Sequence, residues 1–237
     1  MRGWWREISG LVLPIACSGC GRPRTPLCEE CVWQLAGRGP QRVRPCPEPA
    51  GLPVVFAAAR YEHAVRAVLL AHKERGALGL ARPVGAALAG AVRAAVPEAL
   101  GGPEPLVLVP MPSARRAVRA RGHDAARRVA SAAAGVLRRS GAHACALPVL
   151  RQCREVADQS GLSARRRLAN MAGALEVAPG AERLLEGRRA VLVDDLMTTG
   201  ASLVEAARAL RVATAGSAGM SAAVVAAPPL SFGVGRN

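Results

Sequence analysis

Two adjacent carboxylates, Asp194 and Asp195, stand directly after a short apolar segment and directly before a small hydroxylic loop. Ionised carboxylates only accept hydrogen bonds, so two neighbouring hydroxyls of a ribose can donate to the pair, and a divalent cation can share its charge. The loop contains a glycine, which lets backbone N–H groups approach a ligand closely. The loop residues are Thr198, Thr199, Gly200, Ala201 and Ser202.

The elements that must position this string can be predicted from its flanks. Residues 190–193 are apolar, too few for a helix and too continuous for an exposed strand, so they predict a buried strand of a parallel sheet. Ser202 and Glu205 fit the S-x-x-E capping box, which predicts a helix that starts at the loop. One apolar face with helical spacing follows, formed by Leu203, Ala206, Ala207 and Leu210.

Strand, acidic pair, loop and helix N-terminus together favour a site for a phosphorylated sugar, because loop amides and the helix dipole attract a phosphate. The alternative is a solvated acidic turn before an ordinary helix, in which this combination of residues is unusual. The string resembles the phosphoribosyl pyrophosphate (PRPP) motif of the type I phosphoribosyltransferases. The resemblance implies that Asp194 and Asp195 hold the ribose 2- and 3-hydroxyls and that residues 198–202 wrap the 5-phosphate.

The composition is that of a folded protein with 237 residues, of which 51% are hydrophobic. This length can hold one sizeable α/β domain and a small appendage. The longest apolar runs are too short for a membrane span, and residues 10–16, which include Pro14, are too short and broken for the core of a secretory signal. We therefore expect a cytoplasmic protein without a membrane span.

The net charge is +15, from 32 basic and 17 acidic residues, and every basic residue except Lys73 is an arginine. Two explanations of this arginine bias are equally good: a GC-rich genome, and selection for binding nucleic acid or phosphate. Two segments concentrate the charge, one at residues 115–128 and one at residues 151–167.

The first 50 residues differ from the rest, because they hold five of the seven cysteines. Cys17-S-G-Cys20 and Cys28-E-E-Cys31 are two C-x2-C knuckles, each able to present two thiolates to one tetrahedral ion. A reducing cytosol argues against disulfides, so a structural zinc site is favoured over redox-active or inert thiols. Cys46 has no partner cysteine.

We expect residues 1–50 to form a small zinc module and residues 51–237 to form the main domain. Trp4, Trp5 and the apolar residues 11–15 are expected to dock on that domain. The main domain alternates predicted strands with helices, which implies right-handed crossovers and a parallel sheet. Strands are expected at 54–59, 106–109, 144–150, 175–177 and 220–227, and helices at 62–75, 82–96, from Asp124 to about 139, and at 163–170.

The strand at 106–109 opens into an arginine-rich loop, and the carboxyl end of a strand is where an open α/β sheet binds ligands. Arginine forks bind phosphate oxygens bidentately, which suggests pyrophosphate, although a solvated helix face explains some of these residues. The candidates are Arg115, Arg116, Arg119 and Arg121.

Four segments of the chain are similar to the ComF family, which is named for a competence protein involved in DNA uptake. They are Cys17 to Cys31, Tyr61-E-H-A-V-R to Lys73-E-R-G, Val109-P-M-P to Arg119-A-R-G-H-D, and Gln159-S-G-L-S to Arg167-L-A-N. The resemblance implies an α/β fold of the type I phosphoribosyltransferase kind, with a parallel sheet flanked by helices and an N-terminal zinc ribbon. It also implies a role in natural transformation or DNA handling.

Two functions remain open on this evidence. As an enzyme, the protein would bind PRPP with Mg²⁺ and release pyrophosphate as an acceptor nitrogen attacks, while residues 151–162 act as a lid that excludes water. As a binding module, it would sense PRPP or hold DNA, with salt-sensitive contacts to the backbone because the chain has few aromatic residues. The sequence points to no particular acceptor, uptake partner or oligomeric state.

Overall fold

The computed structural model describes residues 15–99, 101–102, 104–157, 161, 163–214 and 220–233. At its centre is a six-stranded sheet in the order β1-β2-β8-β7-β3-β4. All neighbours pair in parallel except β1, which runs antiparallel to β2 at one edge. The strands are β1 (Gln41–Val43), β2 (Val54–Arg60), β3 (Leu106–Pro110), β4 (Ala144–Ala146), β7 (Arg189–Leu196) and β8 (Ser221–Ala227).

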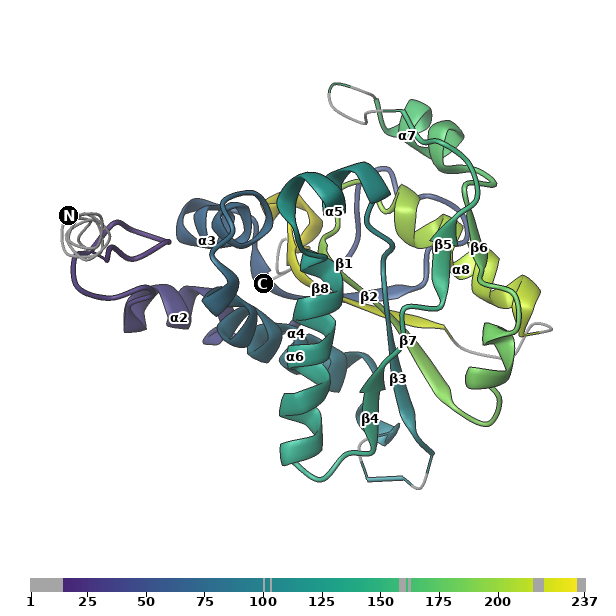
Figure 1. The fold of residues 1–237 in the computed structure, drawn as a ribbon, viewed down its shortest axis with the longest axis horizontal. Helices are drawn as coiled ribbons and strands as arrows, with labels where there is room; N and C mark the ends of the chain where they lie inside the picture. Colours follow the sequence, from purple (N-terminus) through teal and green to yellow (C-terminus); the bar gives the residue numbers. More distant parts are fainter. Residues whose placement is uncertain are drawn as a thin grey trace, which may run out of the picture.

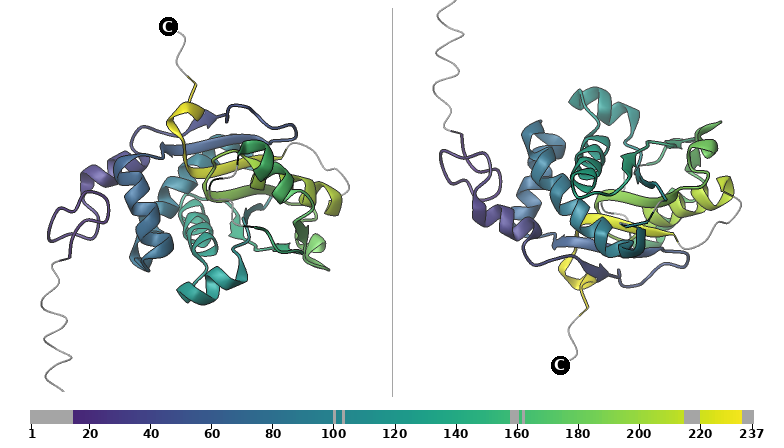
Figure 2. Two further views of the ribbon diagram at one scale, coloured as in Figure 1. Left: turned by 90° about the horizontal axis from the view of Figure 1, so that it is seen from above. Right: turned by 90° about the horizontal axis from the view of Figure 1, so that it is seen from below.

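Helices cover both faces of this sheet, so its inner strands are apolar along most of their length (Figures 1 and 2). Val191 and Val193 of β7 belong to one core cluster, and Leu192, which points the other way, belongs to the second. The first cluster lies under α3 (His63–Glu74), α4 (Ala81–Ala95) and α6 (Ala125–Arg139), and the second lies under α8 (Ala201–Ala213). The predicted parallel α/β sheet is therefore confirmed.

The segment predicted as a single strand at 144–150 is two strands in two different sheets. Residues 144–146 form β4 in the main sheet, whereas β5 (Leu150–Gln152) pairs with β6 (Leu175–Val177) in a separate antiparallel ribbon. Pro148 lies between them and lacks the N–H that a continuing ladder would need. The expectation of one strand was wrong at this proline.

Two short basic helices flank the carboxyl ends of the strands. α5 (Arg115–Arg121) forms within the segment expected to be an arginine-rich loop and ends at Gly122, which has φ 73°. α7 (Ala164–Met171) projects from the β5–β6 ribbon (Figure 1) and is capped by Ser163, which accepts a hydrogen bond from the Arg166 N–H. The predicted cap of α6 is confirmed, because the Asp124 side chain accepts from the Arg127 N–H at 3.1 Å.

The cysteine-rich segment packs beside α3 and α4 at one end of the molecule (Figure 2). Its helix α2 (Glu29–Ala36) buries Leu35, only 1% exposed, in the same core cluster as those helices. Trp4, Trp5 and residues 11–14 of the predicted docking segment lie outside the described residues. Short 3-10 turns are η1 (Leu78–Leu80), η2 (Pro97–Ala99), η3 (Ala181–Leu184) and η4 (Pro229–Ser231). Among the helices described, none is long and apolar enough to span a membrane.

Candidate functional site

The acidic pair lies at the end of β7, at the edge of the sheet where the parallel strands β3, β7 and β8 all reach their carboxyl ends. Asp194 and Asp195 are partly buried, and the Asp195 N–H donates to Asp194 Oδ1 at 2.8 Å. Both carboxylates line a cavity of about 370 Å³ together with Thr198, Ser202 and residues from α3 and α5. This position is where open parallel sheets bind ligands.

Lys73, at the end of α3, completes this acidic centre and was not among the predicted site residues. Its Nζ lies 2.8 Å from Asp195 Oδ2. Burial lowers the pKa of Lys73, but the carboxylates of Asp195 and Asp194 outweigh it, so its pKa is raised and the ammonium stays charged. A signal was present in the sequence, since this is the single lysine among 32 basic residues. Lysine offers a compact, mobile charge where arginine offers a planar fork.

Asp194 is the carboxylate whose ionisation is disfavoured. Burial, followed by the charge of Asp195, raises the pKa of Asp194 to about 8, although Lys73 opposes the shift. Two adjacent carboxylates that share one ammonium therefore hold a proton near neutral pH. The positive charge of a divalent cation would oppose that shift, and carboxylate oxygens are the ligands that Mg²⁺ prefers.

The loop after the acidic pair joins β7 to α8 and is shaped by Gly200. Gly200 is the residue before α8 and has φ 77°, and a Cβ there would lie 2.7 Å from a Leu52 methyl carbon. Because glycine has no side chain, the N-cap of α8 makes no side-chain hydrogen bond, and the first N–H groups of the helix face the loop uncapped. That is the arrangement in which a helix N-terminus binds a phosphate.

The predicted capping box was wrong. Ser202 is the second residue of α8 rather than its cap. Glu205 turns away from the helix start, accepts a hydrogen bond from the Leu175 N–H at 3.1 Å, and pairs with Arg208. Burial opposes ionisation of Glu205, but Arg208 and the Leu175 N–H outweigh it and lower its pKa. Glu205 therefore fastens the β5–β6 ribbon to α8.

The four arginines considered for pyrophosphate occupy different places. Arg121 lines the cavity of the acidic pair, is 13% exposed, and pairs with Glu74 at 3.3 Å. Its Nε is buried without a hydrogen-bond partner among the described residues. Arg115 and Arg116 line an adjoining cavity of about 520 Å³ that shares Pro112 and Ser113 with the first, and Arg119 lines neither.

Arg167 of α7 also reaches the loop of residues 198–202, called the phosphate loop below, although the sequence assigned its cluster only to general charge. Its guanidinium donates to Thr198 Oγ1 at 3.2 Å, and its Nε is buried without a partner in the described part of the chain. The segment before α7 is tied to it, because Arg154 donates to the Asn170 and Ala172 carbonyls at 2.8 and 2.7 Å. Residues 158–160 and 162 of the predicted lid lie outside the described residues.

The four cysteines of the two knuckles come together at one point. The Sγ atoms of Cys17, Cys20, Cys28 and Cys31 all lie within 4.8 Å of one another, with Cys17–Cys28 at 3.7 Å and Cys20–Cys28 at 3.6 Å. Four sulfurs about 2.3 Å from a tetrahedral ion would be separated by about 3.8 Å. The donor set and its spacing therefore fit one such ion, and Cys46 is exposed and lies outside the cluster.

The electrostatics of the cluster also favour a bound cation. Burial opposes ionisation of Cys17, but hydrogen bonds from the backbone of Cys20, Cys28 and Gly19 outweigh it and lower its pKa to about 6. Burial, and after it the neighbouring sulfurs of the cluster, raise the pKa of Cys31 above its usual value. Four thiolates cannot be held together here unless a positive charge offsets their repulsion.

The fold is of the type I phosphoribosyltransferase kind, a mostly parallel α/β sheet flanked by helices. The model of the family described as "Phosphoribosyl transferase domain" matches residues 118–230, slightly less than half of the chain. The matched range contains the acidic pair, the phosphate loop and α7, and the cysteine cluster lies outside it. No curated protein matches the chain.

Proposed function

We propose that this protein binds PRPP together with Mg²⁺ and transfers the phosphoribosyl group to an acceptor nitrogen, with release of pyrophosphate. One observation carries the proposal: a single cavity brings together Asp194, Asp195, the phosphate loop, Lys73 and Arg121. Such a set matches the parts of PRPP, which offers two ribose hydroxyls, a 5-phosphate and a diphosphate. The family match at 118–230 supports the same class of substrate.

Each group has a role that follows from its chemistry. Asp194 and Asp195 accept hydrogen bonds from the ribose hydroxyls and would hold the Mg²⁺, and the amides of residues 198–202 bind the 5-phosphate. Magnesium supplies charge neutralisation for the diphosphate. Arg121 and Lys73 provide positive charge at the place where pyrophosphate leaves, as the bond from the anomeric carbon to the diphosphate oxygen breaks. Arg115, Arg116 and Arg119 extend this positive field.

The test is pyrophosphate release from PRPP and Mg²⁺ in the presence of candidate nitrogenous bases, measured with a coupled pyrophosphatase. Release that depends on one base supports transfer and identifies the acceptor. Tight PRPP binding without release from any base would instead support a PRPP-sensing protein.

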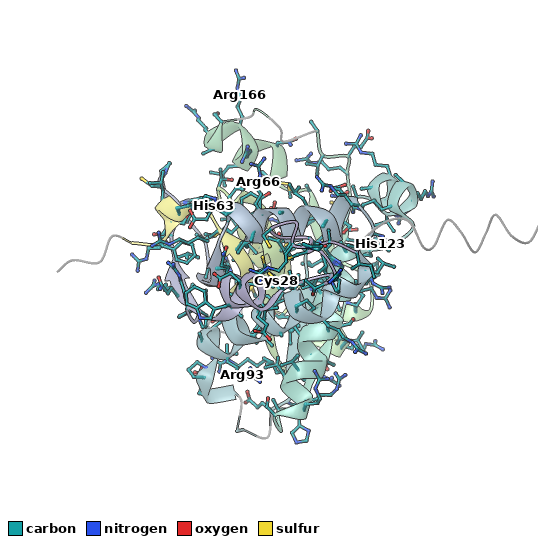
Figure 3. The ribbon with its side chains drawn as sticks, turned by 90° about the vertical axis from the view of Figure 1, so that its left-hand side faces the viewer. Cys28, His63, Arg66, Arg93, His123 and Arg166 are labelled. Carbon is teal, nitrogen blue, oxygen red and sulfur yellow. The ribbon has the colours of Figure 1, made fainter. Side chains whose placement is uncertain are left out.

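Arg167 provides a prediction specific to the phosphate loop. We expect Arg167→Ala to weaken PRPP binding roughly 10- to 100-fold, because a charge-assisted hydrogen bond to a phosphate contributes about 1.5–3 kcal/mol. Arg166→Ala is the matched control. It removes the same charge from the same helix, but the Arg166 side chain points into solvent (Figure 3). Calorimetry that finds equal losses for both variants would show a general charge effect and contradict a contact at the loop.

We propose that Cys17, Cys20, Cys28 and Cys31 bind one structural Zn²⁺ in a module formed by residues 1–50, whose strand β1 extends the sheet of a transferase-type domain formed by residues 51–237. The sulfur separations support this. We also propose a cytoplasmic location, where reduced thiols can serve as ligands; none of the seven cysteines forms a disulfide.

A second function, DNA binding in natural competence, is favoured by the exposed guanidiniums of Arg165 and Arg166 on the projecting helix α7. We expect single-stranded DNA to bind at low salt, with log affinity falling by about 0.7 per phosphate contacted for each unit of log salt. Arg165→Ala with Arg166→Ala should flatten that slope by about 1 to 1.5, measured by fluorescence anisotropy. Arg93→Ala, on a different helix, is the control. Wild-type protein that does not bind DNA at low salt would eliminate this function.

A further inference from the structure

A third cavity, of about 380 Å³, lies between α2, the carboxyl end of β2, the start of α3 and Phe232. It shares no lining residue with the cavity of the acidic pair. Helix α3 runs between the two sites, because His63 at its start lines the third cavity and Lys73 near its end pairs with Asp195. Ten residues of helix rise by about 15 Å, so one small molecule cannot occupy both sites at once.

Two aromatic rings in this cavity each carry a guanidinium on one face. Arg38 lies over the Trp33 ring and Arg60 over the Phe232 ring, with Cζ 5.5 Å from the centroid in both cases. Neither guanidinium forms an ion pair with any carboxylate of the described residues. The cavity therefore offers flat aromatic surface and two guanidiniums that form no close ion pair with a described residue, and its lining also contains the carboxylates of Glu30 and Glu62.

The backbone around Trp33 holds its ring at the surface, where 49% of the residue is exposed. The ring lies against Gly37, where a Cβ would come within 2.4 Å of the Trp33 Cδ1 atom, so any other residue would displace it. His63, across the cavity and visible in Figure 3, has φ 42°, an uncommon value for a residue with a side chain. Backbone strain of this kind tends to occur at functional sites.

Polar groups that could bind the edge of a base complete the lining. The amides of Gln34 and Gln41 offer both donors and acceptors, and Glu62 offers an acceptor. β1 pairs with β2 only as far as Gln41 opposite Ala57, so Ala58 and Ala59 line the cavity beyond the end of that ladder.

We propose that this cavity binds a nucleoside monophosphate, with the base against Trp33 and the phosphate between Arg38 and Arg60. An aromatic ring binds the flat face of any base, and arginine forks bind phosphate bidentately. The volume suits one small ligand, whereas single-strand binding surfaces extend over several nucleotides. The site is independent of the proposed transferase activity and is formed jointly by the cysteine module and the main domain.

The experiment uses the full chain carrying Asp194→Asn and Asp195→Asn, so that the acidic pair cannot bind the nucleotide as a phosphorylated sugar. Calorimetry with AMP, UMP, ribose 5-phosphate and inorganic phosphate should show binding of both nucleotides, with ribose 5-phosphate and phosphate at least about tenfold weaker. Adding Trp33→Ala should weaken AMP binding about 5- to 100-fold, the range expected for loss of one stacked base. Arg66→Ala, which removes a positive charge from α3 next to the lining residue Val65 but does not itself line the cavity, should leave AMP binding unchanged.

Four results would overturn the proposal. They are AMP binding that disappears in the acidic-pair variant, equal affinity for ribose 5-phosphate and AMP, unchanged affinity in Trp33→Ala, and binding of an oligothymidylate without binding of any mononucleotide. If Trp33→Ala unfolds on melting analysis, Arg38→Gln with Arg60→Gln replaces it, because both side chains are exposed. That pair should lose at least about tenfold in AMP affinity, since hydrogen bonds to charged groups contribute about 1.5–3 kcal/mol.

Discussion

Asp194→Asn combined with Asp195→Asn is expected to abolish Mg²⁺-dependent PRPP binding, a loss of at least about 100-fold. The two carboxylates provide the acceptors for the ribose hydroxyls and the oxygen ligands for the cation, and an amide carries no charge and donates from one of its atoms. Lys73 would then face the substrate without its partner at 2.8 Å.

The same substitutions should not unfold the protein. With a pKa of about 8, Asp194 retains its proton in the folded state between about pH 4 and 8, whereas in the unfolded chain it has lost it. The free energy of unfolding therefore falls as pH rises through that window, and Asp194→Asn removes this cost. We expect the single variant to raise Tm most at pH 8 and above, by about 2–4 °C for each kcal/mol recovered. Asp195→Asn removes the ion-pair partner of Lys73, so the Tm of the double variant should rise less than that of Asp194→Asn.

Calorimetry and thermal melting check both parts. The matched control is Glu104→Gln with Glu186→Gln, which removes the same charge from exposed acids that precede β3 and β7. Those positions lie at the opposite ends of the strands from the cavity. If the acidic-pair variant retained the PRPP affinity of the wild type, the proposed substrate site would be wrong.

Cys28→Ser is expected to remove the metal from a protein that otherwise contains one equivalent of Zn²⁺. Its sulfur lies 3.7 Å and 3.6 Å from those of Cys17 and Cys20, so its loss leaves three ligands around the ion. A segment this small has too little core to fold alone, and metal binding supplies its folding free energy. Residues 15–36 should therefore lose structure while the sheet stays folded, because Leu35 is the one fully buried residue that this segment contributes to the two core clusters around the sheet.

Elemental analysis and hydrogen exchange measure the two effects separately. Exchange should become fast across α2 and stay slow in β3, β7 and β8. Cys46→Ser is the control and should retain the metal, since Cys46 is exposed and outside the cluster. Two equivalents of zinc, or none in fully reduced protein, would disprove a single site with these four ligands.

The sequence predicted best where a single local pattern decides the structure. Apolar residues 190–193 indicated a buried strand because only a central parallel strand is covered on both faces, and β7 contains them. Asp124 indicated the start of α6 because capping depends on a few neighbouring residues. The C-x2-C spacing of the two cysteine knuckles likewise predicted that their four sulfurs lie close together.

Contacts between distant segments were not predictable in this way. Lys73 lies in the last turn of an ordinary helix, and only the packing of α3 against the sheet brings its ammonium to Asp195. Arg167 meets Thr198 because the β5–β6 ribbon carries α7 over the loop. Glu205 satisfied a capping pattern in sequence, yet its carboxylate binds Leu175, where it satisfies a buried N–H. In each case the contact depends on how distant segments pack together, which the local sequence pattern does not contain.

The position of β8 determines when this fold can be completed. β8, the last strand of the described residues, lies between β2 and β7 and pairs in parallel with both. During synthesis, β2 therefore has no parallel neighbour until residues 221–227 have left the ribosome. Pairing over such sequence separations is slow, because loop closure precedes the gain from contacts. Until then, the edge of β2 is open to other chains, because β8 is the strand that joins it to the rest of the sheet.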